Sequence, residues 1–322
     1  MDAFIPMLKN VVIFLALAVP GYILVKSKLL KKEDSGVLSK LLMYLGMPFL
    51  ILSGTLGVTF DGQTVLNLVW ATLICTVLTF VFFFASAFVA TKSKQDVDGL
   101  TDKKRKGMER FCSIFSNNGF LGLPLAAAVF GTGEVFTYLV VVNIINNTLM
   151  YTLGVYLISG DKKTIDVKKI FLNPVLIAFI IGIILNLVGI KEFFPEAVTF
   201  SDYFKGIVTP VSMTVLGMKM GGIKFSVMFK SWKMYYVSAL KLILVPVLSV
   251  AVTILLCEFC GLNKNMIMTM FVAFATPTAA LAPAFADSYG GDGENGTIYT
   301  LGNTVLSVLT IPLLYLLLCF IV

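Results

Sequence analysis

Two stretches of the chain combine hydrogen-bonding side chains with residues that break helices. These side chains are amides and hydroxyls, and the breakers are glycine and proline: Asn117, Asn118, Gly119, Thr276 and Thr278, with Pro124 and Pro283. Proline removes a backbone donor, and Asn and Gly are weak helix formers. Each break predicts a new half-helix after its proline, whose first N–H groups are unpaired and carry about half a positive charge. Two such ends that face one point favour an anion.

The composition excludes a soluble protein. Of the 322 residues, 58% are hydrophobic and 13% are charged, against roughly 25% charged residues in soluble domains. The mean hydropathy is +0.93. A membrane helix needs about 20 mostly apolar residues, so the chain has room for about ten spans. The sequence contains no histidine, which excludes histidine acid–base catalysis, histidine metal sites and proteases of the HExxH type.

Hydropathy predicts ten spans, and the two breaks fall in the fourth and the ninth. The predicted ranges are 10–25, 37–56, 65–90, 111–131, 135–158, 170–188, 203–220, 233–257, 266–286 and 296–321. Twenty of the 25 Lys and Arg residues fall in alternate connections, at 26–40, 92–110, 162–169 and 219–233. Because basic loops stay in the cytoplasm, we expect a multi-pass protein of the plasma membrane with both termini outside. The basic clusters then serve topology and contact phospholipids, and we expect no nucleic-acid partner.

The sequence also resembles itself at long range. Residues 115–124 align with 274–283 at an offset of 159, and the segment 48–54 lies near 210–217 at an offset of 162. A unit of five spans is odd-numbered, so a second copy must enter the membrane from the other side. We expect an all-α membrane protein with two inverted five-helix repeats, 1–159 and 170–322, joined by a cytoplasmic linker at 160–169. Matched breaks in two such halves favour a midplane binding site; the alternative is a pair of proline kinks that only shape packing.

Lys241 is the base that lies deep in a predicted span, within the run ALKLILVP. Charges at this depth are costly and usually functional. Lys241 could hold a positive charge near the crossing, where a coupling cation would otherwise sit, or it could be a snorkelling lysine. Cys257 and Cys260 form a lone C-x-x-C without a second pair, which we interpret as apolar packing.

Further amides flank the two broken spans. Asn143, Asn146 and Asn147 lie in the fifth predicted span, and Asn303 lies in the tenth. They could line a cavity or join helices by hydrogen bonds. Asn143 falls within one residue of Asn303 by the repeat offset. We select these two as candidates for the site.

The stretch NNGFLGLP, from Asn117 to Pro124, resembles the auxin efflux carrier family, which includes plant PIN-formed carriers and bacterial permeases for malate or malonate. The resemblance extends over essentially the whole chain, with support at 130–131, around Asn143, at 173–174 and at 282–283. It implies ten helices in two inverted repeats, as in bile-acid symporters and sodium/proton antiporters. It implies a scaffold domain of helices 1, 2, 6 and 7, often dimeric, and an elevator-like transport domain of helices 3–5 and 8–10. It also implies Asn117 and Asn118 as carboxylate contacts, with helices 4 and 9 crossing at Pro124 and Pro283.

We therefore predict a secondary transporter for a small organic carboxylate of the auxin-like, malate or malonate class. The candidate substrate-binding residues are Asn117, Asn118, Gly119, Asn143, Thr276, Thr278 and Asn303. We expect no enzymatic activity, no cofactor and no metal, and the partners are the anion, the lipid bilayer and a second copy through helices 1, 2, 6 and 7. The sequence has no G-x-x-x-x-G-K-[ST] motif, so energy must come from a gradient or a separate subunit.

Two alternatives of other classes stay open. One is a sodium- or proton-coupled cation exchanger of the same fold, which an intramembrane acid would support; none is evident in helices 3–5. The other is a transporter-fold sensor that signals without net flux. Such a sensor usually carries an attached signalling domain.

Overall fold

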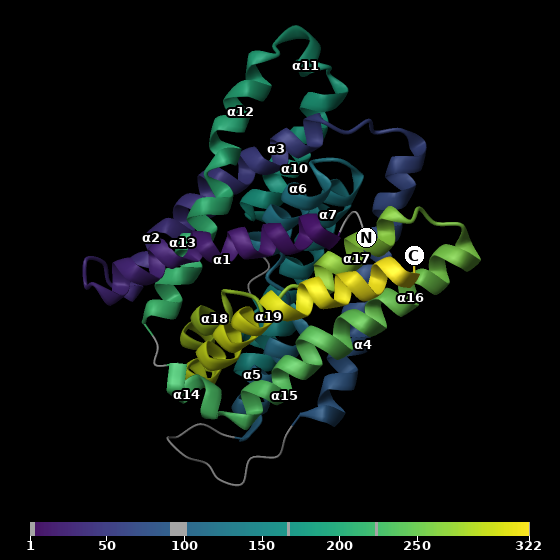
Figure 1. The fold of residues 1–322 in the computed structure, drawn as a ribbon. Coiled ribbons are helices and arrows are strands. Elements are labelled where there is room, and N and C mark those ends of the chain that lie inside the picture. The colour runs from purple at the N-terminus through teal and green to yellow at the C-terminus, as the bar shows by residue number, and fades with distance from the viewer. Residues whose placement is uncertain (1–3, 91–101, 166–167, 223–224, 322) are drawn as a thin grey trace.

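The computed structural model describes residues 4–90, 102–165, 168–222 and 225–321. Within these ranges the regular structure is helical apart from one isolated β-bridge (Figure 1). Each of the predicted ranges coincides with a helix or with a set of consecutive helices. Lys92, Lys94 and Lys224, which contributed to the predicted orientation, lie outside the described residues.

The elements of the first half follow the predicted ranges closely. The first and third ranges are α1 (Phe4–Lys26) and α4 (Gly62–Val89). The second range is α2 (Ser35–Leu41), a π turn (Leu42–Gly46) and α3 (Met47–Leu56). The fourth is α5 (Asp102–Ile114), a π turn (Asn118–Gly122) and α6 (Leu123–Phe130). The fifth is α7 (Glu134–Leu149), a π turn (Met150–Gly154) and α8 (Val155–Ser159).

The second half begins with the short helix α9 (Lys168–Phe171) and the sixth range, α10 (Pro174–Leu187). The next helices are α11 (Ile190–Phe193), α12 (Glu196–Gly206), α13 (Val208–Gly221) and α14 (Phe225–Lys230). The eighth range is α15 (Trp232–Ala239), a π turn (Leu240–Leu244) and α16 (Val245–Cys260). The chain ends with α17 (Asn265–Ala275), α18 (Ala282–Tyr289) and α19 (Gly293–Ile321).

Six helical stretches of the described residues are long and apolar enough to cross a membrane, and the chain is a multi-pass membrane protein. They are Leu8–Lys26, Lys32–Leu56, Gly62–Val89, Glu134–Ser159, Trp232–Cys260 and Gly293–Ile321. The stretches Asn118–Phe130, Pro174–Leu187 and Asn265–Ala275 are apolar but shorter. Two of these three belong to the fourth and ninth ranges, because those helices are interrupted midway.

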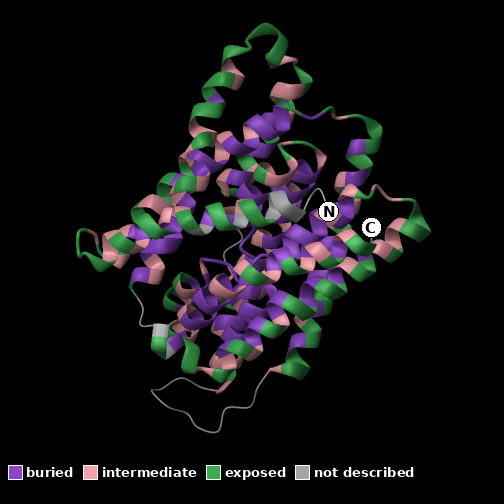
Figure 2. Ribbon diagram, in the orientation of Figure 1, coloured by how far each residue is buried: buried purple, intermediate pink, exposed green. Residues whose placement is uncertain are grey.

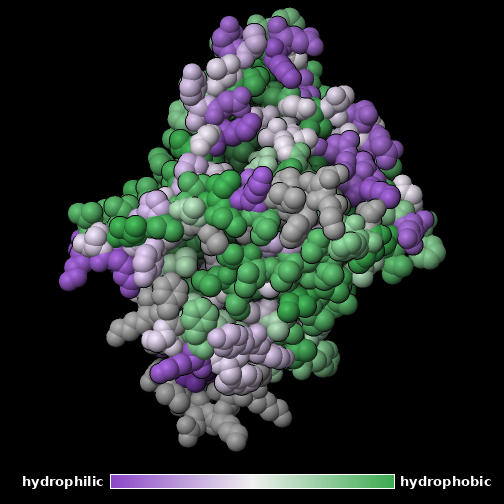
Figure 3. All heavy atoms as spheres, viewed as in Figure 1, coloured by the Kyte–Doolittle hydropathy of each residue, from purple (hydrophilic) through white to green (hydrophobic). Residues whose placement is uncertain are grey.

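The surface agrees with a lipid environment. Buried residues concentrate in the middle of the molecule, and exposed residues run along outer helices such as α1, α12 and α16 (Figure 2). Many of these exposed side chains are large and apolar, as at Val12, Phe84 and Leu309. Figure 3 shows a broad hydrophobic area across this face, with hydrophilic residues at its periphery. Exposure of such a large apolar area to water is unfavourable, whereas its contact with the hydrocarbon of a membrane is not.

Three of the π turns end two residues before a proline. Met47, Leu123 and Val245 each donate an N–H to the carbonyl five residues earlier, and Pro48, Pro124 and Pro246 follow them. Proline has no N–H to donate and its ring clashes with the carbonyl four residues back. The wider turn relieves this conflict and lets the helix continue. Each of these prolines is therefore accommodated by one wider helical turn, and the helix continues past it.

Close backbone packing joins α1 to α13, which are far apart in sequence. A Cβ atom on Gly217 would lie 1.8 Å from the carbonyl oxygen of Ala18, and one on Gly21 would lie 2.1 Å from that of Thr214. Only a residue without a side chain permits this approach, which is how small residues drive helix association in membranes. Elsewhere α3 packs against both α10 and α12.

Replacement of Gly217 by Val is expected to separate α1 from α13. We expect a destabilisation of about 1–3 kcal/mol, the usual cost of overpacking, seen as a lower melting temperature of the detergent-purified protein. Gly36→Ala is the matched control, since a Cβ at Gly36 meets nothing within 4 Å. Equal melting temperatures for Gly217→Val and the wild type would contradict this account of the interface.

Candidate functional site

The two interrupted helices meet at their breaks. Ser116 and Thr278 form an antiparallel β-bridge. Its two backbone hydrogen bonds run from Asn117 N to Pro277 O at 2.8 Å and from Ala279 N to Phe115 O at 2.9 Å. Each break thus supplies the backbone partners that the other lacks. This pairing is the crossing of the fourth and ninth ranges.

Asn146 of α7 completes the pairing of the first break. Its Nδ2 donates to Ser116 O at 3.1 Å, and its Oδ1 accepts from Ser116 N at 3.4 Å. The carbonyl of Cys112, at the end of α5, accepts a hydrogen bond from Thr278 Oγ1 at 2.6 Å. Unpaired backbone groups are costly at membrane depth. By pairing them, these side chains allow two helices to be interrupted in the protein interior.

The crossing does not lie at the two prolines, which corrects our expectation. The bridge forms at Ser116 and Thr278, while Pro124 lies further along, at the start of α6, and Pro283 in the first turn of α18. Pro283 fits the first turn of its helix, where the missing N–H costs nothing, whereas Pro124 follows the π turn that begins at Asn118. The half-helices therefore begin at Asn118 and Ala282, earlier than the prolines suggested.

A cavity of about 490 Å³ adjoins the crossing. This volume is within the range of pockets for small molecules. The polar residues among its lining are Tyr44, Ser116, Asn117, Asn143, Asn147, Tyr151, Asn173, Ser288 and Tyr289. None of the lining residues carries a charged side chain. Gly119, Phe120 and Ala284 bring the first turns of both half-helices to the cavity wall, and the first N–H groups of a helix have no partner within it.

Asn143 is the most unusual polar residue of the cavity. Its side chain is 1% exposed, and neither its Nδ2 nor its Oδ1 has a hydrogen-bond partner. A buried unpaired amide costs about 1–3 kcal/mol for each unmade bond. Gly119, in the first turn of one half-helix, lies close to it, since a Cβ there would be 3.8 Å from Asn143 Oδ1. A buried unpaired amide beside a cavity calls for a partner, and a ligand in the cavity would be one.

The seven candidate binding residues separate into two sets. Asn117, Gly119 and Asn143 line the cavity, together with Asn147. Asn118 accepts a hydrogen bond from Thr276 Oγ1 at 2.9 Å. Thr278 Oγ1 accepts from Asn303 Nδ2 at 2.5 Å, and Asn303 Oδ1 accepts from Ser238. The second set therefore joins helices at the crossing, and its side chains are engaged with one another.

Two lysines reach the interrupted helices. Lys241 Nζ donates to Ser116 Oγ at 2.6 Å and to Phe274 O at 3.1 Å. Lys219 lies within α13, not in a basic loop as expected, and donates to Ala280 O at 3.0 Å. Lys219 and Ser116 were not among the predicted site residues. The available signal was a lysine between two glycines, Gly217 and Gly221, at the end of a predicted span.

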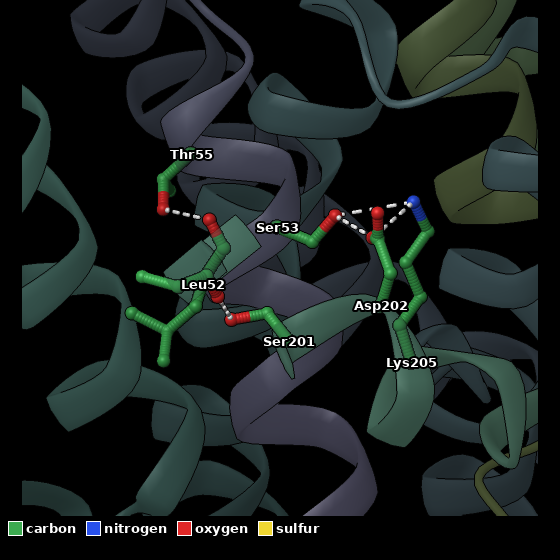
Figure 4. Close-up of polar contacts among 7 residues, drawn as sticks. Leu52, Ser53, Thr55, Ser201, Asp202 and Lys205 are labelled. Carbon is green, nitrogen blue, oxygen red and sulfur yellow. Dashed lines mark hydrogen bonds and ion pairs between the residues drawn. The ribbon is translucent and has the colours of Figure 1, made fainter. Parts of the chain in front are cut away.

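A further charged cluster lies away from the cavity lining (Figure 4). Ser53 Oγ donates to Asp202 Oδ1 at 2.9 Å and accepts from Lys205 Nζ at 3.1 Å. Lys205 also pairs with Asp202 at 3.2 Å. Because Ser53 lies on α3 and the charged pair lies on α12, the cluster joins these two helices.

Replacement of Asn146 by Leu is expected to leave the N–H and C=O of Ser116 buried without partners. We expect a loss of about 2–6 kcal/mol, since each of the two unmade buried bonds costs about 1–3 kcal/mol. Asn147→Leu is the control, because Asn147 lines the cavity on the same helix and is not bonded to Ser116. Thermal unfolding measures both, and a loss as large for Asn147→Leu would refute the role assigned to Asn146.

Comparisons with known proteins agree with a transport role. The family described as "Membrane transport protein" (Mem_trans) matches residues 6–171 and 161–315. An "Uncharacterized transporter" of Methanothermobacter thermautotrophicus is 28% identical over 310 residues, which are 95% of this chain and 96% of that protein. "Uncharacterized transporter MJ1031" of Methanocaldococcus jannaschii is 25% identical over 294 residues, 87% of this chain and 88% of that protein. The chain belongs to the Mem_trans family of membrane transport proteins, the auxin efflux carrier family.

Proposed function

We propose that the protein is a secondary transporter of a small organic carboxylate, of the auxin-like, malate or malonate class, and that it works by elevator-type alternating access. The observation that carries this proposal is Asn143, whose buried and unpaired amide lines the cavity beside the crossing. Such a group costs stability unless a ligand completes it. A ligand that forms hydrogen bonds with the Asn143 amide would offset this loss of stability.

The chemistry of the lining favours an anion with several acceptor atoms. Asn117, Asn143 and Asn147 offer amide donors, and a carboxylate accepts about four hydrogen bonds. The first turns at Gly119 and Ala284 add the positive ends of two helix dipoles. Lys219 brings an ammonium to the carbonyl of Ala280, which is itself in the cavity wall. A lining without an ion-pairing side chain also allows the anion to leave.

The packing supports two bodies that move relative to each other. We assign α1, α2, α3, α10, α12 and α13 to a scaffold, since α1 packs on α13 and α3 packs on α10 and α12. We assign α4–α8 and α15–α19 to a transport domain that contains the crossing. In this proposal residues 1–159 and 170–322 are inverted repeats, and the scaffold faces a second copy in a homodimer.

The cavity adjoins the basic side of the protein. Leu172 and Asn173 in its wall follow the linker that carries Lys162 and Lys163. If basic loops face the cytoplasm, both termini are outside the plasma membrane and this conformation opens inward. The rival proposal of a cation exchanger has less support, since the lining offers no carboxylate.

Replacement of Asn143 by Leu is expected to separate binding from stability. The apo protein should melt at the same temperature or higher, because an unpaired buried amide is removed. The concentration of malate, malonate or an aromatic carboxylate that gives a stated rise in melting temperature should be at least tenfold higher, since a ligand raises the melting temperature only through its affinity for the folded state. The measurement is the melting temperature of purified protein against a panel of carboxylates.

Gln63→Leu is the matched control, because Gln63 is an amide in the first turn of α4 and does not line the cavity. Its carboxylate response should equal that of the wild type. If no carboxylate stabilises the wild type while Na⁺ or a pH change does, the organic-anion proposal fails and the cation exchanger replaces it.

A further inference from the structure

Two helices end at the crossing and direct their C-terminal carbonyls toward it. The last residue of α5 is Ile114 and that of α17 is Ala275, and the bridge between Ser116 and Thr278 follows both ends. The C-terminus of a helix carries about half a negative charge. The carbonyls of these two ends make the potential beside them negative in the protein interior, where water does not screen it. A positive charge beside these carbonyls is therefore favourable, just as the positive first turns at Asn118 and Ala282 favour an anion on the cavity side.

Lys241 is placed to supply that charge. Its ammonium contacts one residue from each interrupted helix, Ser116 Oγ at 2.6 Å and the carbonyl of Phe274 at 3.1 Å. Its side chain is 0% exposed, so it does not snorkel toward a membrane surface. Within the part of the chain that the structure describes, no carboxylate forms an ion pair with Lys241. The charge of Lys241 is thus matched by hydroxyl and carbonyl dipoles alone.

These ligands are of the kind that hold a soluble alkali cation. Carbonyl and hydroxyl oxygens are hard donors, which suit hard cations better than nitrogen or sulfur ligands do. Lys241 lies in the π turn Leu240–Leu244, and Pro246 follows this turn after one residue, Val245. The lysine therefore enters the crossing from a fixed position on a third span.

We propose that the ammonium of Lys241 is a tethered cation that occupies the place of a soluble alkali cation at the crossing. The crossing of this protein then binds no Na⁺, Li⁺ or K⁺. As a consequence that rests on the proposed transport function, the carboxylate moves without Na⁺ coupling at the crossing. The transport domain carries its own counter-charge through the cycle.

The test compares melting temperatures in chloride salts of choline, Li⁺, Na⁺ and K⁺ at constant ionic strength. The wild type should melt at the same temperature in all four salts. Lys241→Ala should melt lower in choline, and one of the alkali cations should restore about 3 °C or more with a saturating dependence on concentration. Saturable stabilisation of the wild type by an alkali cation would overturn the proposal, and this arm needs no variant.

Two further variants separate charge from hydrogen bonding and from position. Lys241→Gln keeps a donor but removes the charge, so it should also melt lower in choline than the wild type; full stability of this variant would refute a requirement for charge. Lys219→Ala removes the other lysine bonded to an interrupted range, and alkali cations should not restore it. Failure of every cation to restore Lys241→Ala would reduce Lys241 to a structural donor and overturn the proposal.

These melting measurements contain no carboxylate. They can therefore succeed while the carboxylate panel fails, or fail while the panel succeeds, so the two proposals are tested separately. If the carboxylate panel succeeds, uptake into proteoliposomes adds a final comparison. Carboxylate uptake by the wild type should be unchanged when choline replaces Na⁺ on both sides.

Discussion

The structure depends on one constraint: backbone groups opened in the membrane interior must find partners inside the protein. Two helices are interrupted at the crossing, and neither could satisfy its break alone. The antiparallel bridge between Ser116 and Thr278 pairs them with each other, and Asn146 pairs the remaining groups of Ser116. Because these partners come from helices distant in sequence, the breaks also specify how those helices pack. The cavity adjoins the place where the two interrupted helices are paired, so its position follows from the same constraint.

The amides around the crossing differ in whether they are paired within the protein. Asn118, Asn146 and Asn303 are committed to partners within the protein. Asn143 is not, although it is as deeply buried as they are. Residue type and depth are therefore insufficient to identify a ligand contact. What distinguishes Asn143 is the unfilled hydrogen-bonding capacity of its amide beside an open volume.

Glycine and proline have different tasks in the rest of the fold. Gly21 and Gly217 let the backbones of α1 and α13 approach more closely than side chains would permit. The π turns before Pro48, Pro124 and Pro246 absorb the missing donor without ending the span. The first feature lets two helices pack backbone to backbone, and the second lets a span continue past a proline. The two true interruptions are then confined to the place where the cavity lies.

The sequence by itself determined the membrane class, the helical ranges and the two helices that would be broken, because hydropathy and helix-breaking residues act locally. It also identified Asn117, Gly119 and Asn143, which line the cavity, as candidate binding residues. Only the tertiary structure decided where the helices cross, since a break can form several residues from the proline that suggests it. It alone decided which polar groups were already paired, which removed Thr278 and Asn303 from the cavity wall. Pairing depends on partners such as Ser238 and Asn146, and no local pattern encodes which distant chain segment will supply them.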